Sequence, residues 1–198
     1  MKAKRLWWTI RLALKRGAGR RGEYAKKAGV FGMVGERVRY QPRMVPIYSE
    51  LIKFHNNIMV ARNVDFVTHD AIHLVFNGIL KENPEIAAQL DGKFHERIGC
   101  IEVMDNVFIG SNSVILYNTR IGPNVVIASG SVVTKDCEPN SVYAGCPARK
   151  IGSLDAFMLK LKQQENNGIV ATTTHNQALT ASEIENAWNI FRERHTDA

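Results

Sequence analysis

Hydrophobic positions recur every six residues through the middle of the chain. From residue 103 to residue 133 the recurring residue is isoleucine or valine, and a small or β-branched residue follows each one after four positions. The first column consists of Val103, Ile109, Ile115, Ile121, Ile127 and Val133, and the second consists of Val107, Ser113, Thr119, Val125, Ser131 and Cys137. Strands of about four residues are too short here for a run of hairpins, but parallel strands of this length can stack with tight corners. The pattern therefore predicts an all-β solenoid whose coils bury their apolar residues against one another.

The same spacing is weaker upstream, from residue 33, and it is interrupted twice. Between Tyr40 and Phe54 the spacing slips by two residues, and the proline-containing segment 42–50 is expected to absorb the slip. Residues 69–97 do not follow the spacing at all, so we predict an inserted loop there. The upstream columns consist of Phe54, Val60 and Phe66, with Ile58 and Val64.

Both flanks of the repeat have the spacing of helices. Near the start, Leu6, Ile10 and Leu14 recur at helix spacing between Lys and Arg residues. Near the end, apolar residues of 154–164 and 180–195 also recur at helix spacing, and the second of these segments starts with a capping box.

These features divide the chain into three predicted parts. The first is a basic helical N-terminal arm, the second is the solenoid domain with its inserted loop at 69–97, and the third is a C-terminal helical tail. Their boundaries are 1–32, 33–152 and 153–198.

Length and charge narrow the classes of protein that fit. The 198 residues, 45% of them hydrophobic, suffice for one sizeable core. No apolar run approaches the roughly 20 residues of a membrane-spanning helix, and no secretory signal is present, so we expect a cytoplasmic protein. Residues 1–27 contain ten Lys or Arg residues against Glu23 alone, or +9, so the remainder of a chain of net charge +7 carries −2. A basic arm on a weakly acidic body argues against a nucleic-acid-binding protein.

Two interpretations of the basic arm stay open. Residues 1–16 could lie on an anionic membrane surface as a short amphipathic helix. Alternatively, Trp7 and Trp8 pack on the body or on a neighbouring subunit while the charges stay in water.

The three cysteines do not form a recognisable framework. Cys100, Cys137 and Cys146 are odd in number and lack C-x-x-C spacing, so the sequence supports neither a disulfide scaffold nor a zinc ribbon. We expect three buried or half-buried thiols, and none of them is placed as an acyl-carrying nucleophile.

Several motifs carry a resemblance to a known family. They read FVTHDA at 66–71, IGSNSVIL at 109–116, IGPNVVIASGSVVTKD at 121–136 and YAGCPARKIG at 143–152. Over about residues 33–152 the chain resembles the hexapeptide-repeat acyltransferases, closest to the branch that acetylates hydroxyls of sugars, polysaccharides and antibiotics. The resemblance implies a left-handed parallel β-helix with three hexapeptides per coil, a homotrimer with active sites between subunits, and acetyl-coenzyme A as the acyl donor.

His69 is the candidate general base. It lies where the repeat stops and the insertion begins, and a neutral imidazole suits the removal of a hydroxyl proton near pH 7. In the resembled family the histidine of the THD motif has this role. Asp70 is the candidate partner for the other ring nitrogen, and capping of the loop is the equally open alternative for its carboxylate.

The expected coenzyme site lies in the last coils. Extended pantetheine pairs with exposed backbone groups, and its phosphates need cations. By resemblance, the contacting residues are Ala128, Ser129, Gly130, Thr134, Lys135, Arg149 and Lys150. Alternatives stay open for two of these positions and for Gly145. Gly130 and Gly145 could simply form tight turns, and Lys135 could be a solvated turn residue.

A metal site is the competing use of the histidines, since the same fold hosts enzymes with a zinc ion held by three histidines. His73 and His95 lie inside the predicted loop, so we expect no metal and assign both to the loop surface or a substrate pocket. His175 and His195, in the polar tail, carry no functional signal.

The sequence therefore predicts an acetyl-coenzyme A-dependent O-acetyltransferase that transfers the acetyl group directly to a hydroxyl of a sugar or polysaccharide. An antibiotic-acetylating or xenobiotic-acetylating enzyme of the same branch is one alternative. A non-catalytic solenoid scaffold is the other. The insertion at 69–97 is expected to select the acceptor, whose identity the sequence does not reveal.

Overall fold

The computed structural model of the protein describes residues 2–90, 92–174 and 178–195, so His175 lies outside the described residues. The chain divides into two compact units, Met1–Gly152 and Ser153–Ala198.

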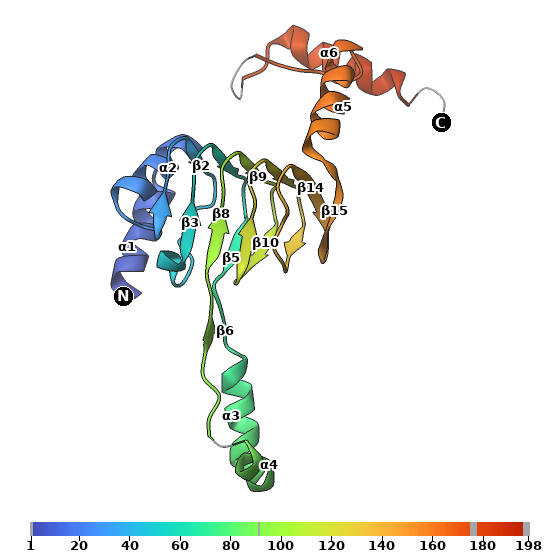
Figure 1. Cartoon of the computed structure of the whole chain (residues 1–198). Coiled ribbons are helices and arrows are strands. Elements are labelled where there is room, and N and C mark those ends of the chain that lie inside the picture. Colours follow the sequence, from blue (N-terminus) through green and yellow to red (C-terminus); the bar gives the residue numbers. More distant parts are fainter. Residues whose placement is uncertain (1, 91, 175–177, 196–198) are drawn as a thin grey trace. The chain divides into compact units, whose positions relative to one another are not determined.

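The first unit contains a three-sided solenoid of parallel strands (Figure 1). Three sheets have the strand orders β1-β3-β8-β11, β13-β10-β5 and β15-β14-β12-β9-β4-β2. Successive strands of the stacked coils belong to different sheets, whereas the last two strands, β14 and β15, are neighbours in one sheet. The predicted parallel β-solenoid is confirmed. The strands are β1 (Met33–Val34), β2 (Val38–Tyr40), β3 (Ile52–Phe54), β4 (Ile58–Val60), β5 (Asp65–Val67), β8 (Ile101–Val103), β9 (Val107–Ile109), β10 (Val114–Leu116), β11 (Thr119–Ile121), β12 (Val125–Ile127), β13 (Val132–Val133), β14 (Ser141–Gly145) and β15 (Ala148–Ser153).

Both columns of the sequence repeat face the interior. The two residues lie two positions apart on one strand, because the side chains of a strand alternate between its faces. In β12, for example, Val125 and Ile127 are both fully buried, and they pair with Val107 and Ile109 of the preceding coil. Stacked positions such as Asn106 and Asn124 are 18 residues apart, so three hexapeptides complete one coil.

The slip in the first coil is also confirmed. Met33 pairs with Lys53 and Tyr40 pairs with Val60, and equivalent positions of this coil, such as Glu36 and Asn56, are 20 residues apart instead of 18. The segment between β2 and β3, which contains the short 3₁₀ helix η1 (Ser49–Leu51), takes up the two extra residues.

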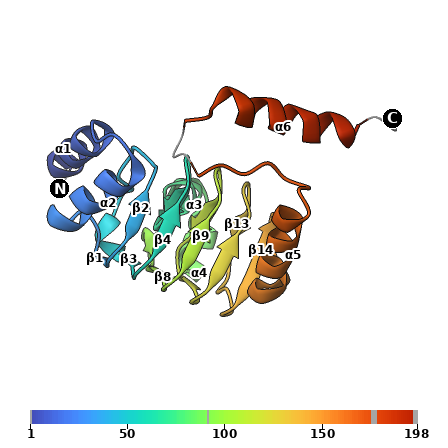
Figure 2. The ribbon, with the colours of Figure 1, turned by 90° about the horizontal axis from the view of Figure 1, so that it is seen from above.

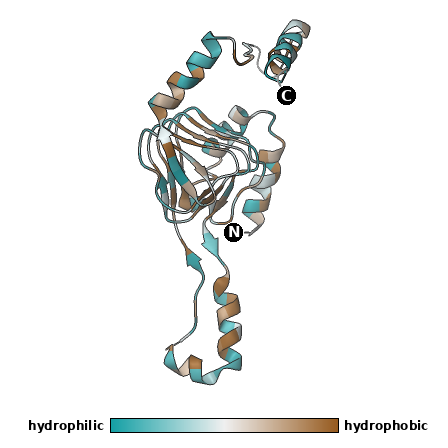
Figure 3. Ribbon diagram, turned by 90° about the vertical axis from the view of Figure 1, so that its right-hand side faces the viewer, coloured by the Kyte–Doolittle hydropathy of each residue, from teal (hydrophilic) through white to brown (hydrophobic). Residues whose placement is uncertain are grey.

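The insertion is not a loop, and this part of the prediction was wrong. Stacked positions on either side of it, such as Asn57 and Asn106, are 49 residues apart. The extra residues form helices α3 (Ile72–Glu82) and α4 (Pro84–Gln89), which extend from a two-stranded antiparallel root of β6 (His69–Asp70) and β7 (Arg97–Ile98) (Figure 1). The loss of the six-residue spacing marked the insertion correctly, but it did not exclude the helix spacing inside it. Apolar and polar residues alternate around α3 (Figure 3), and none of its side chains is buried.

Two helices of the basic arm cover one end of the solenoid (Figure 2). Helix α1 (Lys2–Ala13) contributes Leu12 to the core, and α2 (Ala18–Lys27) contributes Ala25. Gly22 approaches β2 so closely that a Cβ there would lie 1.8 Å from the carbonyl oxygen of Val38. An open sheet edge invites pairing with another chain, and α2 removes this hazard at the first coil.

The second unit consists of α5 (Leu154–Asn166) and α6 (Ala181–Glu193). The predicted capping box at Thr180 is confirmed, because the Thr180 hydroxyl accepts from the Glu183 amide and the Glu183 carboxylate accepts from the Thr180 amide. Within the described residues, none of the helices is both long enough and apolar enough to cross a bilayer.

Candidate functional site

The backbone around His69 is fixed on both sides. Thr68, which is fully buried, donates its hydroxyl to the carbonyl oxygen of Ile47 at 2.6 Å, and its own carbonyl accepts from the amide of Gly99 at 2.9 Å. His69 itself pairs with Ile98 across β6 and β7. The imidazole of His69 is therefore attached to a backbone segment that hydrogen bonds and strand pairing hold in place.

The ring of His69 lies against an aromatic neighbour. It meets the ring of Tyr48 edge to face, with 5.4 Å between the ring centroids. The Tyr48 hydroxyl donates to a carboxylate oxygen of Glu96 at 2.9 Å, and this hydrogen bond raises the pKa of Tyr48. The Nδ1 atoms of His69 and His73 are both buried and have no hydrogen-bond partner among the described residues. Buried polar atoms without a partner are uncommon in folded proteins, so both nitrogens call for a functional explanation.

Asp70 contacts the insertion and the solenoid instead of the ring of His69. One carboxylate oxygen accepts from the Ile72 amide at the start of α3, at 3.3 Å, and the other accepts from the Tyr117 hydroxyl at 2.7 Å. The hydrogen bond to Asp70 is the main cause of a raised pKa of Tyr117, and nearby Arg97 opposes it. In this structure the carboxylate of Asp70 thus contacts the start of α3 and Tyr117, and its role as a partner of His69 stays a prediction.

Three strand ends bring the candidate residues to one corner of the solenoid. Leu116 of β10 pairs with Val67 of β5, and Ile115 pairs with Val133 of β13, so the chain leaves all three strands at the same edge. In this register Tyr117 lies beside the start of the insertion, and Lys135 lies one strand further. Adjacent strands are about 4.8 Å apart, so the backbones of Thr68 and Lys135 are separated by about 10 Å along this corner.

The residues predicted to contact the coenzyme through their backbone groups are not equally free to bind it. Ala128 uses both of its backbone groups within the solenoid, since its amide donates to Tyr143 and its carbonyl accepts from the hydroxyls of Ser113 and Ser131. Ser129 and Gly130 are exposed. Gly130 has a φ of 74° with no atom within 4 Å of a hypothetical Cβ, so its turn needs glycine and its surface is open to a ligand.

The predicted cations also differ from one another. Lys150 forms an ion pair with Glu138 at 2.9 Å, which raises the pKa of Lys150. The guanidinium of Arg149 donates to the carbonyl of Ala148 at 3.0 Å. Thr134 and Lys135 are exposed, and among the described residues Lys135 has no ion-pair partner. Among the predicted cations, Lys135 is therefore the one whose charge is most available to bind a phosphate of the coenzyme.

The exposure of two cysteines contradicts the prediction that all three are buried or half-buried. The third cysteine is buried, in agreement with that prediction. Cys100 and Cys146 are exposed and not buried or half-buried, because they lie on the coil surface and the terminal turn. Cys137 is buried in the second column, and burial, together with the nearby charge of Asp136, raises the pKa of its thiol to about 12. A thiol that stays protonated at neutral pH is a poor nucleophile.

Sequence reasoning missed two polar rows on the solenoid surface. Asparagines at one corner form a ladder in which each side-chain amide donates to the next asparagine; it contains Asn57, Asn106, Asn124 and Asn140. On a neighbouring sheet Glu102 accepts from Arg120 at 2.8 Å and contacts His55 at 3.0 Å, so its pKa is lowered, chiefly by the hydrogen bond to His55. The recurrence of Asn at every sixth residue, at 106, 112, 118 and 124, was the signal for asparagines at the corners.

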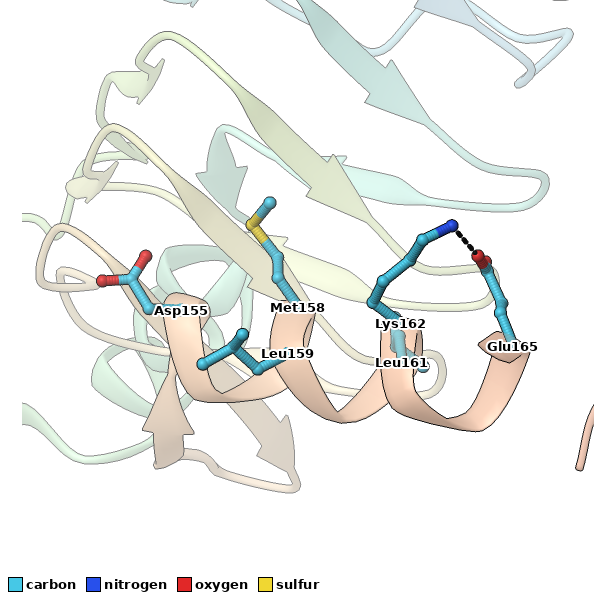
Figure 4. A pocket seen from close by; sticks show the side chains of 6 residues that line it. All are labelled: Asp155, Met158, Leu159, Leu161, Lys162 and Glu165. Carbon is cyan, nitrogen blue, oxygen red and sulfur yellow. Dashed lines mark hydrogen bonds and ion pairs between the residues drawn. The ribbon is translucent and has the colours of Figure 1, made fainter. Parts of the chain in front are cut away.

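Other parts of the described chain have fewer features that indicate a catalytic or binding site. No group of three or more His, Cys, Asp and Glu residues within it could hold a metal ion. A shallow hollow lies along α5 (Figure 4), lined by Asp155, Met158, Leu159, Leu161, Lys162 and Glu165, and Lys162 pairs there with Glu165 at 2.8 Å. This hollow contains none of the predicted site residues.

The repeat of this chain is similar to that of known bacterial transferases. Residues 101–135 match the family described as bacterial transferase hexapeptide (six repeats). Protein CapG of Staphylococcus aureus is 41% identical over 111 residues, which cover 56% of this chain and 58% of that protein. Galactoside O-acetyltransferase of Escherichia coli (strain K12) is 32% identical over 133 residues, which cover 64% of this chain and 66% of that protein.

A solved structure agrees with these relatives. A maltose O-acetyltransferase from Clostridium difficile 630 aligns with a TM-score of 0.50 and 26% identity over 77% of this chain and 87% of that chain. The chain thus carries the hexapeptide repeat of this family in residues 101–135 and is similar to these relatives beyond it. It spans 58% and 66% of the length of the two curated relatives named above.

Proposed function

We propose that the protein is an acetyl-coenzyme A-dependent O-acetyltransferase that acts on a hydroxyl of a sugar or polysaccharide. The observation that carries the proposal is His69, braced at the corner where the insertion leaves the coils, with a buried ring nitrogen that has no partner among the described residues. Two relatives whose names state O-acetylation of galactosides and of maltose support the reaction and the kind of acceptor.

In the proposed reaction His69 acts as the general base. Its imidazole takes the proton of the acceptor hydroxyl while the hydroxyl oxygen forms a bond to the thioester carbonyl carbon. The carbon–sulfur bond then breaks, and the imidazolium returns the proton to the departing thiolate. A thiolate is already a stable leaving group, so a single imidazole suffices. The raised thiol pKa of Cys137 favours this direct transfer over an acyl-enzyme.

The coenzyme is proposed to lie along the corner that runs from His69 towards Lys135. Gly130 provides an open, exposed turn, and Lys135 and Arg149 provide positive charge for its phosphates. Ser129, Thr134 and Lys150 complete the proposed set. Ala128 is proposed to support the turn from below, since its backbone groups are already bonded within the coils.

Two further properties are proposed from the family resemblance. The solenoid is left-handed, and three copies of the chain assemble with His69 of one subunit beside the coenzyme site of the next. Sedimentation equilibrium checks the second property, because a monomeric active enzyme would contradict it. We also propose that the protein acts in the cytoplasm.

The decisive experiment compares two histidines that share one feature. His69→Asn should lower kcat by about 100-fold or more, as loss of a positioned general base does, and leave the affinity for acetyl-coenzyme A unchanged. His73 also has a buried Nδ1 atom without a partner in the described chain, so His73→Asn is the matched control and should retain most of the activity.

The assay combines purified protein, acetyl-coenzyme A, a panel of galactosides, maltose and antibiotics, and a dye that reports free thiol. Circular dichroism confirms that both variants fold. Loss of activity only in His73→Asn would make His73 the base. Wild-type turnover only with an antibiotic would select the xenobiotic alternative, and failure of acetyl-coenzyme A to bind in calorimetry would favour the scaffold.

A further inference from the structure

We propose that the outer face of α1 docks the protein onto an anionic lipid membrane. This inference does not depend on the proposed acetyl transfer. The outer face is defined here as Leu6, Trp7, Ile10 and Leu14.

Helix α1 has a second, inner face that already attaches it to the solenoid. Leu12 is fully buried, and Trp8 packs against the core. The Arg5 guanidinium donates to the carbonyl of Val45, and the amide of Val45 donates to the hydroxyl of Thr9. The orientation of α1 is therefore fixed, so the face opposite these residues is presented to solvent by the fold.

The outer face is a continuous apolar stripe. Leu6, Ile10 and Leu14 follow one another at intervals of four residues, and Trp7 lies beside them, as expected for one side of a helix. Their exposed fractions are 62%, 56%, 47% and 73% for Leu6, Trp7, Ile10 and Leu14, respectively. The Leu14 amide still donates to the Ile10 carbonyl at 3.1 Å, so Leu14 continues the last turn of the helix. Because these four side chains are exposed, packing in the core does not explain why they are apolar.

Positive charge lies next to the stripe. The guanidinium of Arg11 lies 5.1 Å from the ring centroid of Trp7, which belongs to the stripe, and the ammonium of Lys4 lies 4.5 Å from that of Trp8 on the inner face. Residues 1–27 carry ten Lys or Arg residues and one Glu, whereas the rest of the chain is weakly acidic. The electrostatic field of the protein thus orients its basic N-terminal end towards a negatively charged surface.

An anionic bilayer matches both features at once. Its headgroup region accepts Trp and aliphatic side chains to a shallow depth, and its phosphates and serine carboxylates pair with Lys and Arg. The helix has 12 residues, or about 18 Å, which is too short to span a bilayer but suits a helix lying in the plane of the interface. A second copy of this chain would carry the same positive charge and would repel it.

The test uses the full-length chain and flotation with vesicles. One set contains phosphatidylcholine alone and the other contains phosphatidylcholine with about 30% phosphatidylserine, a fraction chosen to give a strongly negative surface. Wild type should float with the anionic vesicles, detach as the salt concentration rises, and show a blue-shifted tryptophan emission when bound. Deletion of residues 1–16 is not suitable, because it would remove Leu12 from the core.

The first test variant combines Leu6→Ser, Trp7→Ser and Ile10→Ser and should lower vesicle affinity at least about tenfold. The matched control, Met158→Ser with Leu159→Ser, removes exposed apolar side chains from the other unit and should bind as wild type. A second variant, Lys4→Gln with Arg11→Gln, keeps the stripe and should lose the preference for anionic vesicles, which keeps the test valid if the triple variant does not fold.

Three results would overturn the proposal. Wild type could fail to float with anionic vesicles, or both test variants could bind as tightly as wild type. Alternatively, sedimentation could show that the stripe joins two copies of the chain in the absence of lipid.

Discussion

Contacts with residues outside the THD motif hold His69 in place. Thr68 anchors the backbone to Ile47, and Tyr48 lies against the imidazole ring. Tyr117, one coil further along, holds Asp70 through a 2.7 Å hydrogen bond. These partners are far from His69 in the sequence, so their role depends on the register of the coils. Because the phenol of Tyr117 is the donor and its pKa is raised, this contact is complete at neutral pH and is lost only as strongly alkaline pH removes the proton.

Thiol reactivity provides a prediction at the residue scale. Cys100 and Cys146 are exposed, whereas Cys137 is buried and its pKa is raised to about 12. At pH 8 a thiol reagent should therefore label Cys100 and Cys146 in the native protein and reach Cys137 only after addition of denaturant. Mass spectrometry of labelled peptides identifies the sites, and rapid native labelling of Cys137 would contradict its position in the core.

At the scale of the elements, tight corners separate the short strands. Several corners contain an asparagine in the left-handed backbone conformation, including Asn106 at a φ of 58° and Asn124 at 60°. Asparagine tolerates this conformation better than other residues with a side chain. Asn124 also accepts a hydrogen bond from Asn106 and donates one to Asn140, both at 2.8 Å. The same residue thus fits the corner and links three coils.

Replacing Asn124 should separate these two contributions. Asn124→Gly keeps the backbone conformation and removes the ladder contacts, so it should cost about 1 kcal/mol of unfolding free energy. Asn124→Ala adds backbone strain and should cost about 2 kcal/mol or more. Urea unfolding measures both.

The control for this pair is Asn118→Gly. Asn118 has the same conformation, with a φ of 57°, but the ladder does not include it. Its substitution should change stability by less than that of Asn124. Equal effects at the two positions would show that the ladder contributes nothing measurable.

At the scale of the whole molecule, the solenoid aligns groups from distant parts of the sequence along one corner. His69 follows β5, Tyr117 follows β10 and Lys135 follows β13, and these three strands form one sheet. A long coenzyme can therefore contact groups that belong to several coils. The same stacking covers one end of the solenoid with α1 and α2 and leaves the outer face of α1 free.

Lys135, at the far end of this corner, and Lys150, in β15 of another sheet, should respond differently to substitution. Lys135→Ala should raise the KM for acetyl-coenzyme A by about 3-fold to 10-fold with kcat unchanged, as expected for loss of a partly solvated phosphate contact. Lys150→Ala should have a smaller effect, because Lys150 is already paired with Glu138. Steady-state kinetics at fixed ionic strength measures both. A larger effect for Lys150 would place the phosphates on the other side of the terminal turn.

The sequence by itself determined the solenoid, the slip of two residues in the first coil and the limits of the insertion. Each depends on the spacing of apolar residues, and this spacing is a local property because every coil repeats the same contacts. The capping box of α6 was readable for the same reason, since its two partners are three residues apart.

Only the tertiary structure decided which groups surround His69 and which face of α1 stays exposed. The partners of His69 and Asp70 come from other coils, and a two-residue change in register would replace them. Both sides of α1 are apolar in the sequence, so the contacts of Leu12 and Thr9 with the body were needed to identify the inner side. Local spacing determines a repeating backbone, but long-range packing determines which side chains meet.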